Sequence, residues 1–311
     1  MGCDATGIEL LPVGIFVMEF RQIVTNIQVE NIKAEKDKIW KALESIPDNI
    51  KHIEHISITE GAFPVETERL LNKYLEYCER LGGEIGLLLK FSAFCVLEEI
   101  SFTRKDGQYL RWDYRSGRSL GGKPFNKGEI WSFKDAVNKK LQNIIEDIWE
   151  SQSSRQNFFK STSKTGSITV YQDSILTRLP ILEKDAFDFI ITSPPYANRY
   201  DYTRTYALEL VFLKNNSDKV KELRQAMLSC TVENKEKIDD LRNFYYRLNR
   251  IEDFEKILTV FNENKALHEV LGLLEDQKKK NLWNNNGILK FIKNYFLESC
   301  FIIFEMSRVL K

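Results

Sequence analysis

The tetrapeptide Ser193-Pro194-Pro195-Tyr196 carries the residue types in this chain that are best suited to chemistry. The Ser193 hydroxyl and the Pro194 carbonyl are two hydrogen-bond acceptors, and the paired prolines hold the backbone stiff, so that the carbonyl is already aimed. Two such acceptors could take hydrogen bonds from an amino group on an aromatic ring, which makes its nitrogen more nucleophilic. Tyr196 offers a flat face on which a planar base could stack.

The same four residues have a structural alternative, in which a Pro-Pro turn leaves a strand and Tyr196 packs on the core. At average composition, SPPY arises by chance in roughly one chain in a thousand of this length. It also follows an apolar run directly, residues 187–192 (FDFIIT). Catalytic groups in open α/β sheets gather just beyond the carboxyl ends of strands. We therefore favour the chemical interpretation.

The elements that must position this motif are predicted to be strands of a parallel sheet. Residues 167–171 (SITVY) and 187–192 predict strands, the second of them buried, with a short helix over residues 175–182 between them. A strand–helix–strand order indicates a parallel sheet with a crossover helix. Near the start of the chain, residues 6–8 predict a strand that ends at Glu9, followed by a turn and a helix over residues 15–29.

The rest of the chain is predicted to be mostly helical. Apolar spacing indicates helices between about residues 31 and 150, and residues 151–167, rich in Ser, Thr and Gly, are predicted to form a linker. Further helices are expected after Tyr196, the last over residues 288–310. This pattern divides the chain into residues 1–30, a helical insertion over residues 31–165, and residues 166–311.

The composition limits the classes of function. Forty-five basic and forty-five acidic residues cancel, so any nucleic acid must be bound by a local patch. The five cysteines form no CxxC pair, so they predict neither a disulfide framework nor a zinc cage, and we interpret them as reduced, mostly buried thiols. The sequence shows neither an apolar membrane span nor a signal peptide, which predicts a cytoplasmic protein.

The segment FDFIITSPPYANRYDYTRTYALEL resembles the catalytic motif of DNA methyltransferases that act on exocyclic amino groups. The form TSPPY is typical of the N4-cytosine branch, although some N6-adenine enzymes also use Ser. ATGIEL and VYQDS resemble the second and third sheet strands of that family, and FEMSRVLK resembles a helix that precedes a Pro-Gly-Gly turn. The resemblance covers residues 1 to about 30 and about 167 to 311. It implies a Rossmann-like, S-adenosylmethionine-dependent α/β fold with an incomplete parallel sheet and a large, mostly helical insertion.

The resemblance also implies roles for single residues. Glu9 would bind the ribose hydroxyls of S-adenosylmethionine, and Asp173, with Ser174 beside it, would lie near the adenine ring. Ser193, Pro194, Pro195 and Tyr196 would hold the target base. Methyl transfer would be direct, from the sulfonium to the nitrogen. The structural alternatives are a solvated turn residue for Glu9 and a helix N-cap for Asp173.

The sequence departs from the family in its cofactor loop. The family has a glycine-rich loop of the type DPFxGSGTT about twenty residues before the position of ATGIEL. Neither of the candidate substitutes, residues 81–86 (LGGEIG) and 116–122 (SGRSLGG), has the context of following an apolar strand and opening a helix. We therefore expect a fragment or one half of a split enzyme, truncated at both ends. A second chain would supply the loop and the C-terminal strands, and this chain alone would transfer little or no methyl.

Arginines and histidines supply the remaining candidate sites. Residues 104–123 hold six basic and two acidic side chains, interleaved with aromatic ones, which predicts either a DNA-contacting surface or an ordinary charged hairpin. The predicted DNA-contacting residues are Arg104, Arg111, Arg115, Arg118, Arg199 and Arg204. His52 and His55 form an HxxH pair that lacks a third ligand, so we interpret it as a solvated helix end and expect no metal.

The leading hypothesis is a site-specific DNA methyltransferase of a restriction–modification system, acting on cytosine N4. Three alternatives stay open. The first is an N6-adenine enzyme. The second is a relative that methylates RNA bases or a protein glutamine, although such relatives usually carry Asn or Asp at the position of Ser193. The third is a non-catalytic remnant or subunit that binds DNA or a partner chain.

Overall fold

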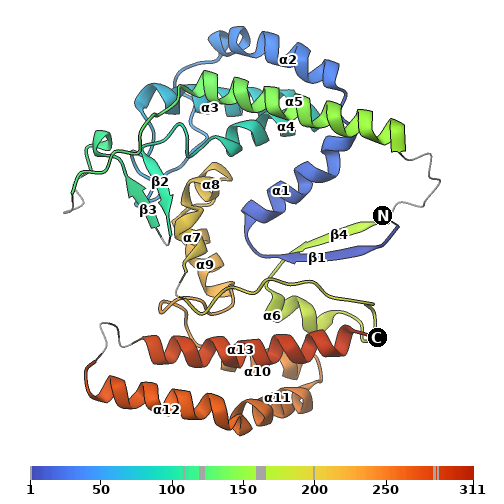
Figure 1. The fold of residues 1–311 in the computed structure, drawn as a ribbon, viewed down its shortest axis with the longest axis vertical. Helices are drawn as coiled ribbons and strands as arrows, with labels where there is room; N and C mark the ends of the chain where they lie inside the picture. Colours follow the sequence, from blue (N-terminus) through green and yellow to red (C-terminus); the bar gives the residue numbers. More distant parts are fainter. Residues whose placement is uncertain are drawn as a thin grey trace. The chain divides into compact units, whose positions relative to one another are not determined.

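The computed structural model describes residues 2–107, 109–118, 123–158, 166–198, 200–282, 285 and 287–311, and Figure 1 shows its elements along the chain. They form two compact units. Unit 1 comprises Met1–Asp4, Pro12–Ser167 and Tyr202–Val220, and unit 2 comprises Ala5–Leu11, Ile168–Asp201 and Lys221–Lys311. The predicted division of the chain placed α1 (Pro12–Ile23) and residues 202–220 in the same parts as the sheet strands. In the structure, both segments belong to unit 1 with the other helices.

Unit 1 is built from helices around aromatic side chains. Its longer helices are α1, α2 (Val29–Ala42), α3 (Val65–Leu81), α4 (Gly83–Cys95) and α5 (Phe133–Phe158), and two short ones are α7 (Tyr202–Thr205) and α8 (Ala207–Phe212). Phe20 stacks on Phe91 with the ring centroids 3.7 Å apart, and Phe94 meets Phe212 of α8 at 5.8 Å. Rings of this size dominate the energetics of a small core, which explains why α8 belongs to this unit.

The predicted linker after residue 150 is in part a helix. α5 continues to Phe158, so the prediction is wrong for residues 151–158, while residues 159–165 lie outside the described part of the chain. Buried Ile144 and Ile148 hold this helix against the unit, and the Gln152 amide donates to the Ile27 carbonyl at 3.3 Å. Packing of this kind overrides a polar composition, because helix propensity is only a weak preference.

An antiparallel hairpin interrupts the helices of unit 1. β2 (Thr103–Asp106) pairs with β3 (Tyr109–Trp112) in the register Thr103↔Trp112 to Asp106↔Tyr109. Thr103, Leu110 and Trp112 are buried on one face. The segment therefore does form a hairpin.

Unit 2 contains a short parallel sheet. β1 (Ala5–Glu9) pairs with β4 (Ile168–Gln172) from Ala5↔Ile168 to Glu9↔Gln172, and α6 (Ile175–Arg178) follows. These predicted strands and the helix after them are confirmed.

The predicted buried strand at residues 187–192 is wrong. Phe189 is 65% and Ile191 87% exposed, and the described chain pairs this run only through the parallel bridge Phe187↔Leu310. A strand needs a neighbour along its whole length to satisfy its backbone groups. Only Phe187 has one here, so the apolar run is extended without being part of a sheet.

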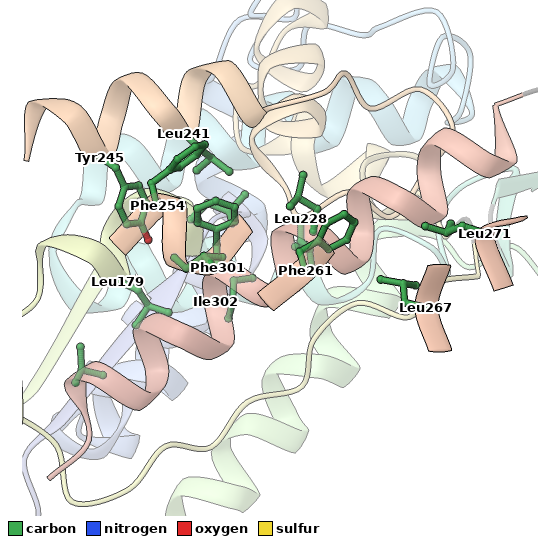
Figure 2. Close-up of a cluster of buried hydrophobic side chains, with 14 residues drawn as sticks. Leu179, Leu228, Leu241, Tyr245, Phe254, Phe261, Leu267, Leu271, Phe301 and Ile302 are labelled. Atoms are coloured by element: carbon green, nitrogen blue, oxygen red, sulfur yellow. The ribbon is translucent and has the colours of Figure 1, made fainter. Parts of the chain in front are cut away.

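Four helices form the larger part of unit 2: α10 (Ile238–Arg247), α11 (Ile251–Glu263), α12 (Lys265–Lys279) and α13 (Ile288–Val309). Figure 2 shows their shared core, in which the rings of Tyr245 and Phe254 lie 5.5 and 5.4 Å from that of Phe301. The predicted final helix is confirmed as α13. No helix in the described residues is long and apolar enough to cross a membrane.

Candidate functional site

The two acidic residues expected to bind cofactor lie side by side in unit 2. Glu9 is the last residue of β1, and Asp173 directly follows β4. Because the two strands are parallel and in register, their carboxyl ends share one edge, and the Asp173 backbone N–H donates to the Glu9 carbonyl at 3.2 Å. Glu9 Oε1 accepts from the backbone N–H of Leu11 at 2.7 Å, which fixes the carboxylate at the strand end.

Asp173 also organises the helix that follows it. Its Oδ1 accepts from the backbone N–H of Ser174 at 2.8 Å and from the Thr177 hydroxyl at 3.1 Å, and its Oδ2 pairs with Arg178 at 3.0 Å. The N-cap position of α6 is Ser174. Asp173 is therefore not the N-cap itself, as the structural alternative had it. It stands one residue before the N-cap, and its carboxylate still accepts hydrogen bonds from Ser174 and from Thr177 in the first turn of α6.

Ser174 is more buried than the two acids, at 9% exposure. Its hydroxyl donates to the carbonyl of Ala226 at 2.8 Å. This bond fixes the start of α6 to the end of α9 (Ser217–Ala226). The hydroxyl proton of Ser174 is thus committed to the protein itself.

The segment that carries Ser193-Pro194-Pro195-Tyr196 is an exposed loop of unit 2, which we call the target loop (residues 191–198). Ser193 and Pro194 are exposed, and the Tyr196 side chain is 69% exposed. This contradicts the alternative in which Tyr196 packs on the core. The Tyr196 carbonyl accepts from the backbone N–H of Asn198 at 2.8 Å, so the chain turns immediately after the tyrosine.

The C-terminal end of α13 holds the start of this loop. The backbone N–H groups of Ala186 and Phe187 donate to the Val309 carbonyl at 2.8 and 2.9 Å, and the N–H of Lys311 donates to the Phe187 carbonyl at 3.0 Å. Asp188 adds an exposed ion pair to Lys311 at 2.8 Å. Main-chain bonds therefore fix the direction in which the chain leaves for Ser193.

An ion pair holds the other end. Asp201 is buried, at 4% exposure, and its Oδ2 lies 3.0 Å from Nε of Arg224 on α9. Arg224 also pairs with Glu233 at 3.4 Å. The target loop is thus exposed between two ends that the rest of unit 2 fixes.

Glu305, a buried acid near the end of α13 that holds the start of the target loop, was not identified from the sequence. Glu305 of α13 is 1% exposed and pairs with Arg250 at 2.7 Å and with Arg308 at 2.5 Å, while the Tyr245 hydroxyl donates to it at 2.7 Å. Burial and this carboxylate hold the pKa of Tyr245 well above its usual range. The two arginines also donate to the carbonyls of Pro180 and Leu179 at 2.8 and 2.9 Å.

A sequence signal for this network existed. Glu298 and Glu305 are seven residues apart in α13, a spacing that places both on the same, apolar face of the helix. Glu298, also 1% exposed, pairs with Lys237 at 2.9 Å and accepts from the Ser229 hydroxyl at 2.6 Å. Charged residues that are buried in this way require partners. The partners of these two acids hold together the helices that support the target loop.

The predicted DNA-contacting arginines fall into different settings. Arg104 and Arg111 are exposed and lie opposite each other on the hairpin. Arg115 instead binds the buried Asp113 through Nε and Nη2 at 2.7 and 2.9 Å, and holds the pKa of that carboxyl well below its usual range.

The remaining three positions differ again. Arg118 lies 4.0 Å over the Trp112 ring and donates to the Ser57 carbonyl at 2.6 Å. Arg204 is exposed on α7, and Arg199 lies outside the described residues.

The interpretation of His52 and His55 as a solvated helix end is wrong. Both precede α3 in a non-helical segment, and their side chains are only 8% and 13% exposed. Glu76 and Glu79 of α3 supply two further oxygens, and one ligand atom from each of His52, Glu76 and Glu79 lies within 4.8 Å of the others. Arg80 and Lys214 each pair with one of these carboxylates at 2.6 Å, so ion pairs account for the cluster.

The glycine segments differ from a cofactor loop in their context. Residues 81–86 join helix α3 to helix α4, and a Cβ on Gly86 would lie 2.6 Å from the Cys78 carbonyl oxygen, so this glycine permits the two helices to pack closely. Of residues 116–122, only 116–118 are described, and Ser116 is the last residue of the 3-10 turn Tyr114–Ser116.

The cysteines meet the expectation of mostly buried thiols in part. Cys78 and Cys230 are buried, Cys95 and Cys300 are half-buried, and Cys3 is exposed. Burial raises the pKa of Cys95 and of Cys230 to about 11. Such thiols are inert at neutral pH.

Comparison with known proteins finds relatives over the whole length of the chain. The chain is 40% identical over 315 residues to proteins named Type II methyltransferase M.AvaI from Nostoc sp. and from Anabaena variabilis. It is 38% identical over 331 residues to Type II methyltransferase M.BsoBI from Geobacillus stearothermophilus. Each alignment covers 100% of this chain and 62% of the relative, so the chain spans less than two thirds of these proteins. Neither a family model nor a solved structure matches it.

Proposed function

We propose that this chain forms the cofactor-ribose and target-base part of a DNA methyltransferase of a restriction–modification system. It would transfer a methyl group from S-adenosylmethionine to an exocyclic amino group, that of cytosine N4. The names of the relatives support the methyltransferase class. The observation that carries the proposal is the meeting of Glu9 and Asp173 at one sheet edge, in the same compact unit as the exposed Ser193-Pro194-Pro195-Tyr196 loop.

The residues at the sheet edge fit the nucleoside half of the cofactor. The backbone of Leu11 holds one oxygen of Glu9, and Oε2 has no hydrogen-bond partner among the described residues, so it can accept from a ribose hydroxyl. Asp173 and Ser174 begin the next connection along the same edge. A Rossmann-like sheet binds its ligand at the carboxyl ends of its strands, where these residues lie. When bound, the cofactor supplies an electrophilic methyl group.

The target loop fits a flipped base. The Ser193 hydroxyl and the Pro194 carbonyl would accept hydrogen bonds from the two N–H groups of the amino group, so that the nitrogen lone pair is directed away from the ring plane. Tyr196, exposed and on a loop fixed at both ends, stacks against the base. The methylated nitrogen would then lose one proton to solvent, and no bond would form between the protein and the base.

We also propose that a second chain contributes the glycine-rich cofactor loop and further strands. Among the described residues, no glycine-rich segment follows a strand and opens a helix. Arg104, Arg111 and Arg204 are the exposed candidates for contact with DNA. Arg115 and Arg118 would act through the fold of the hairpin, because protein groups already hold both.

The test measures cofactor binding and methyl transfer separately. Titration calorimetry with S-adenosylmethionine is done on the full chain, alone and with a purified polypeptide equivalent to the part of M.AvaI outside the alignment. Tritium transfer to duplex DNA is measured on the same two samples, and digestion to nucleosides identifies the product. We expect N4-methylcytosine from the complemented sample and little transfer by the chain alone.

Tyr196→Ala and Tyr246→Ala form a matched pair, because the two side chains are 69% and 71% exposed. We expect the first to lose roughly 10- to 100-fold in transfer through lost base stacking, and the second to keep it. If the product were N6-methyladenine, the assignment of cytosine as the target base would be wrong, and the rest of the proposal would stand. An absence of cofactor binding and of transfer in both samples would favour the non-catalytic, DNA- or partner-binding alternative.

A further inference from the structure

The outward face of the β2–β3 hairpin carries an unusual set of polar side chains. Strand alternation and the register place Arg104 opposite Arg111 and Asp106 opposite Tyr109 on one face, while Thr103, Leu110 and Trp112 are buried on the other. Arg111 is 46% and Tyr109 57% exposed. This face, which we call the ribbon face, comprises Arg104, Asp106, Tyr109 and Arg111.

Like charges directly opposite each other destabilise an antiparallel pair. The Arg104↔Arg111 pair therefore does not stabilise the hairpin. It suits a ligand that accepts hydrogen bonds from both guanidinium groups. Arg111 is also oriented: its guanidinium lies 4.1 Å over the Phe125 ring and 3.3 Å from Asp106 Oδ2. An arginine held in this way loses less entropy when it binds.

The acid on this face favours base edges over phosphates. A carboxylate repels a phosphate, but it can accept a hydrogen bond from cytosine N4, while arginine donates in a fork to guanine O6 and N7. A two-stranded ribbon also fits the major groove of B-DNA. We propose that the ribbon face reads base edges in the major groove, with Arg104 and Arg111 as specificity-determining residues.

The hairpin packs on other elements of unit 1. Lys105, on the inward face, pairs with Glu209 of α8 and lies 4.9 Å from the Tyr206 ring centroid. The Thr205 hydroxyl donates to the Gly107 carbonyl at the hairpin turn at 3.4 Å. The hairpin is thus fixed, within unit 1, to α7 and α8. The inference rests on the proposed function, because it assigns the sequence reader of that same enzyme.

The experiment selects duplexes from a randomised pool with the full chain and sequences the bound fraction. We expect the wild type to enrich a short motif. In Arg104→Ala/Arg111→Ala, preference at one or two positions should fall by roughly 5- to 150-fold. Arg104→Lys/Arg111→Lys keeps the charge but loses the fork, so it should relax the same positions while retaining affinity for unrelated DNA.

The control is Lys256→Ala/Lys279→Ala, which removes two exposed charges elsewhere and should leave the motif unchanged. Thermal unfolding checks that each variant folds. An unchanged motif in the arginine variants, a uniform loss of affinity for all sequences, or no motif with the wild type would each overturn the inference. Cofactor binding and tritium transfer, measured on the same variants together with the complementing polypeptide, separate its failure from that of the proposed function: a complemented sample that enriches a motif but neither binds cofactor nor transfers methyl refutes only the latter.

Discussion

Unit 2 joins two regions of opposite character, the exposed target loop and the helical platform formed by α10, α11 and α13. In the loop, Ile191 is 87% and Tyr196 69% exposed. In the platform, Glu298 and Glu305 are each 1% exposed and are fully paired. The stability of this unit therefore lies in the platform, and the loop residues remain available to a substrate.

The platform is joined to the segment before the target loop through backbone groups. Arg250 and Arg308 connect Glu305 to the carbonyls of residues 179 and 180, and the end of α13 pairs with Phe187. A rigid support behind an exposed loop is what a pre-aimed acceptor pair requires, because a misplacement of about 1 Å lowers rates strongly. The comparison predicts that platform substitutions lower stability first, whereas loop substitutions lower activity alone.

The largest expected effect is on the platform. Glu305→Ala would leave two arginines partly buried without their acid, and we expect it to lower the free energy of unfolding by about 3–5 kcal/mol. Urea unfolding measures the loss. Glu255→Ala, at an exposed position of α11, is the control and should change stability by less than about 0.5 kcal/mol. A small effect of Glu305→Ala would show that the platform does not depend on this network.

The next effect is on the target loop. Ser193→Ala removes one of the two acceptors, so we expect methyl transfer by the complemented enzyme to fall by roughly 100-fold or more, by analogy with the loss of one oxyanion donor. The free energy of unfolding should stay within about 0.5 kcal/mol, because Ser193 is exposed. Thr259→Ala removes an exposed hydroxyl elsewhere and serves as the control. Equal losses of stability and activity would contradict the separation of roles.

The difference between the regions also explains what the sequence could predict. β1, β4 and α13 were predictable because their apolar periods and terminal residues are local signals. Residues 187–192 carry the same local signal, but whether they form a strand depends on a neighbour. The fixed ends of the loop depend on Asp201 meeting Arg224 and on Phe187 meeting Val309, contacts between distant segments that no local pattern encodes.

The arginines show the same limit. Composition marks residues 104–123 as basic, but it does not separate Arg111, which is exposed, from Arg115, which the buried Asp113 holds. That separation follows from the register of the hairpin and from the turn after it. A candidate DNA surface could therefore be located from the sequence, whereas its contacting residues could not.

A buried acid in unit 1 extends the comparison to pH. The carboxylate of Asp113 is fully buried and accepts from Arg115 and from the backbone N–H of Lys127 at 2.8 Å, which holds its pKa below the usual value. A lowered folded-state pKa gives stability that is present above about pH 4, the unfolded value, and is lost as the pH falls below it. Asp113→Asn should lose about 2 kcal/mol at pH 7 and show a flatter decline in acid. Urea unfolding from pH 7 to pH 3 measures both, and parallel curves for variant and wild type would contradict this role.

A smaller effect is expected at the sheet edge. Glu9→Gln keeps the acceptor for the Leu11 N–H but loses the charge, so we expect about tenfold weaker binding of S-adenosylmethionine, or about 1.4 kcal/mol. Calorimetry measures the affinity on the complemented sample. Glu19→Gln, at an exposed position of α1, is the control and should bind as the wild type does. Unchanged affinity in Glu9→Gln would remove Glu9 from the cofactor site.

The smallest effect separates two ways of fixing the start of the target loop. Asp188 and Lys311 form an ion pair in which the side chains are 77% and 56% exposed, and solvent screens such a pair. Asp188→Asn should therefore change the free energy of unfolding by less than about 0.5 kcal/mol, and methyl transfer by less than twofold. The backbone bonds between Phe187 and the end of α13 remain in the variant. A large loss of transfer with unchanged stability would mean that the side-chain pair, rather than the main chain, aims the loop.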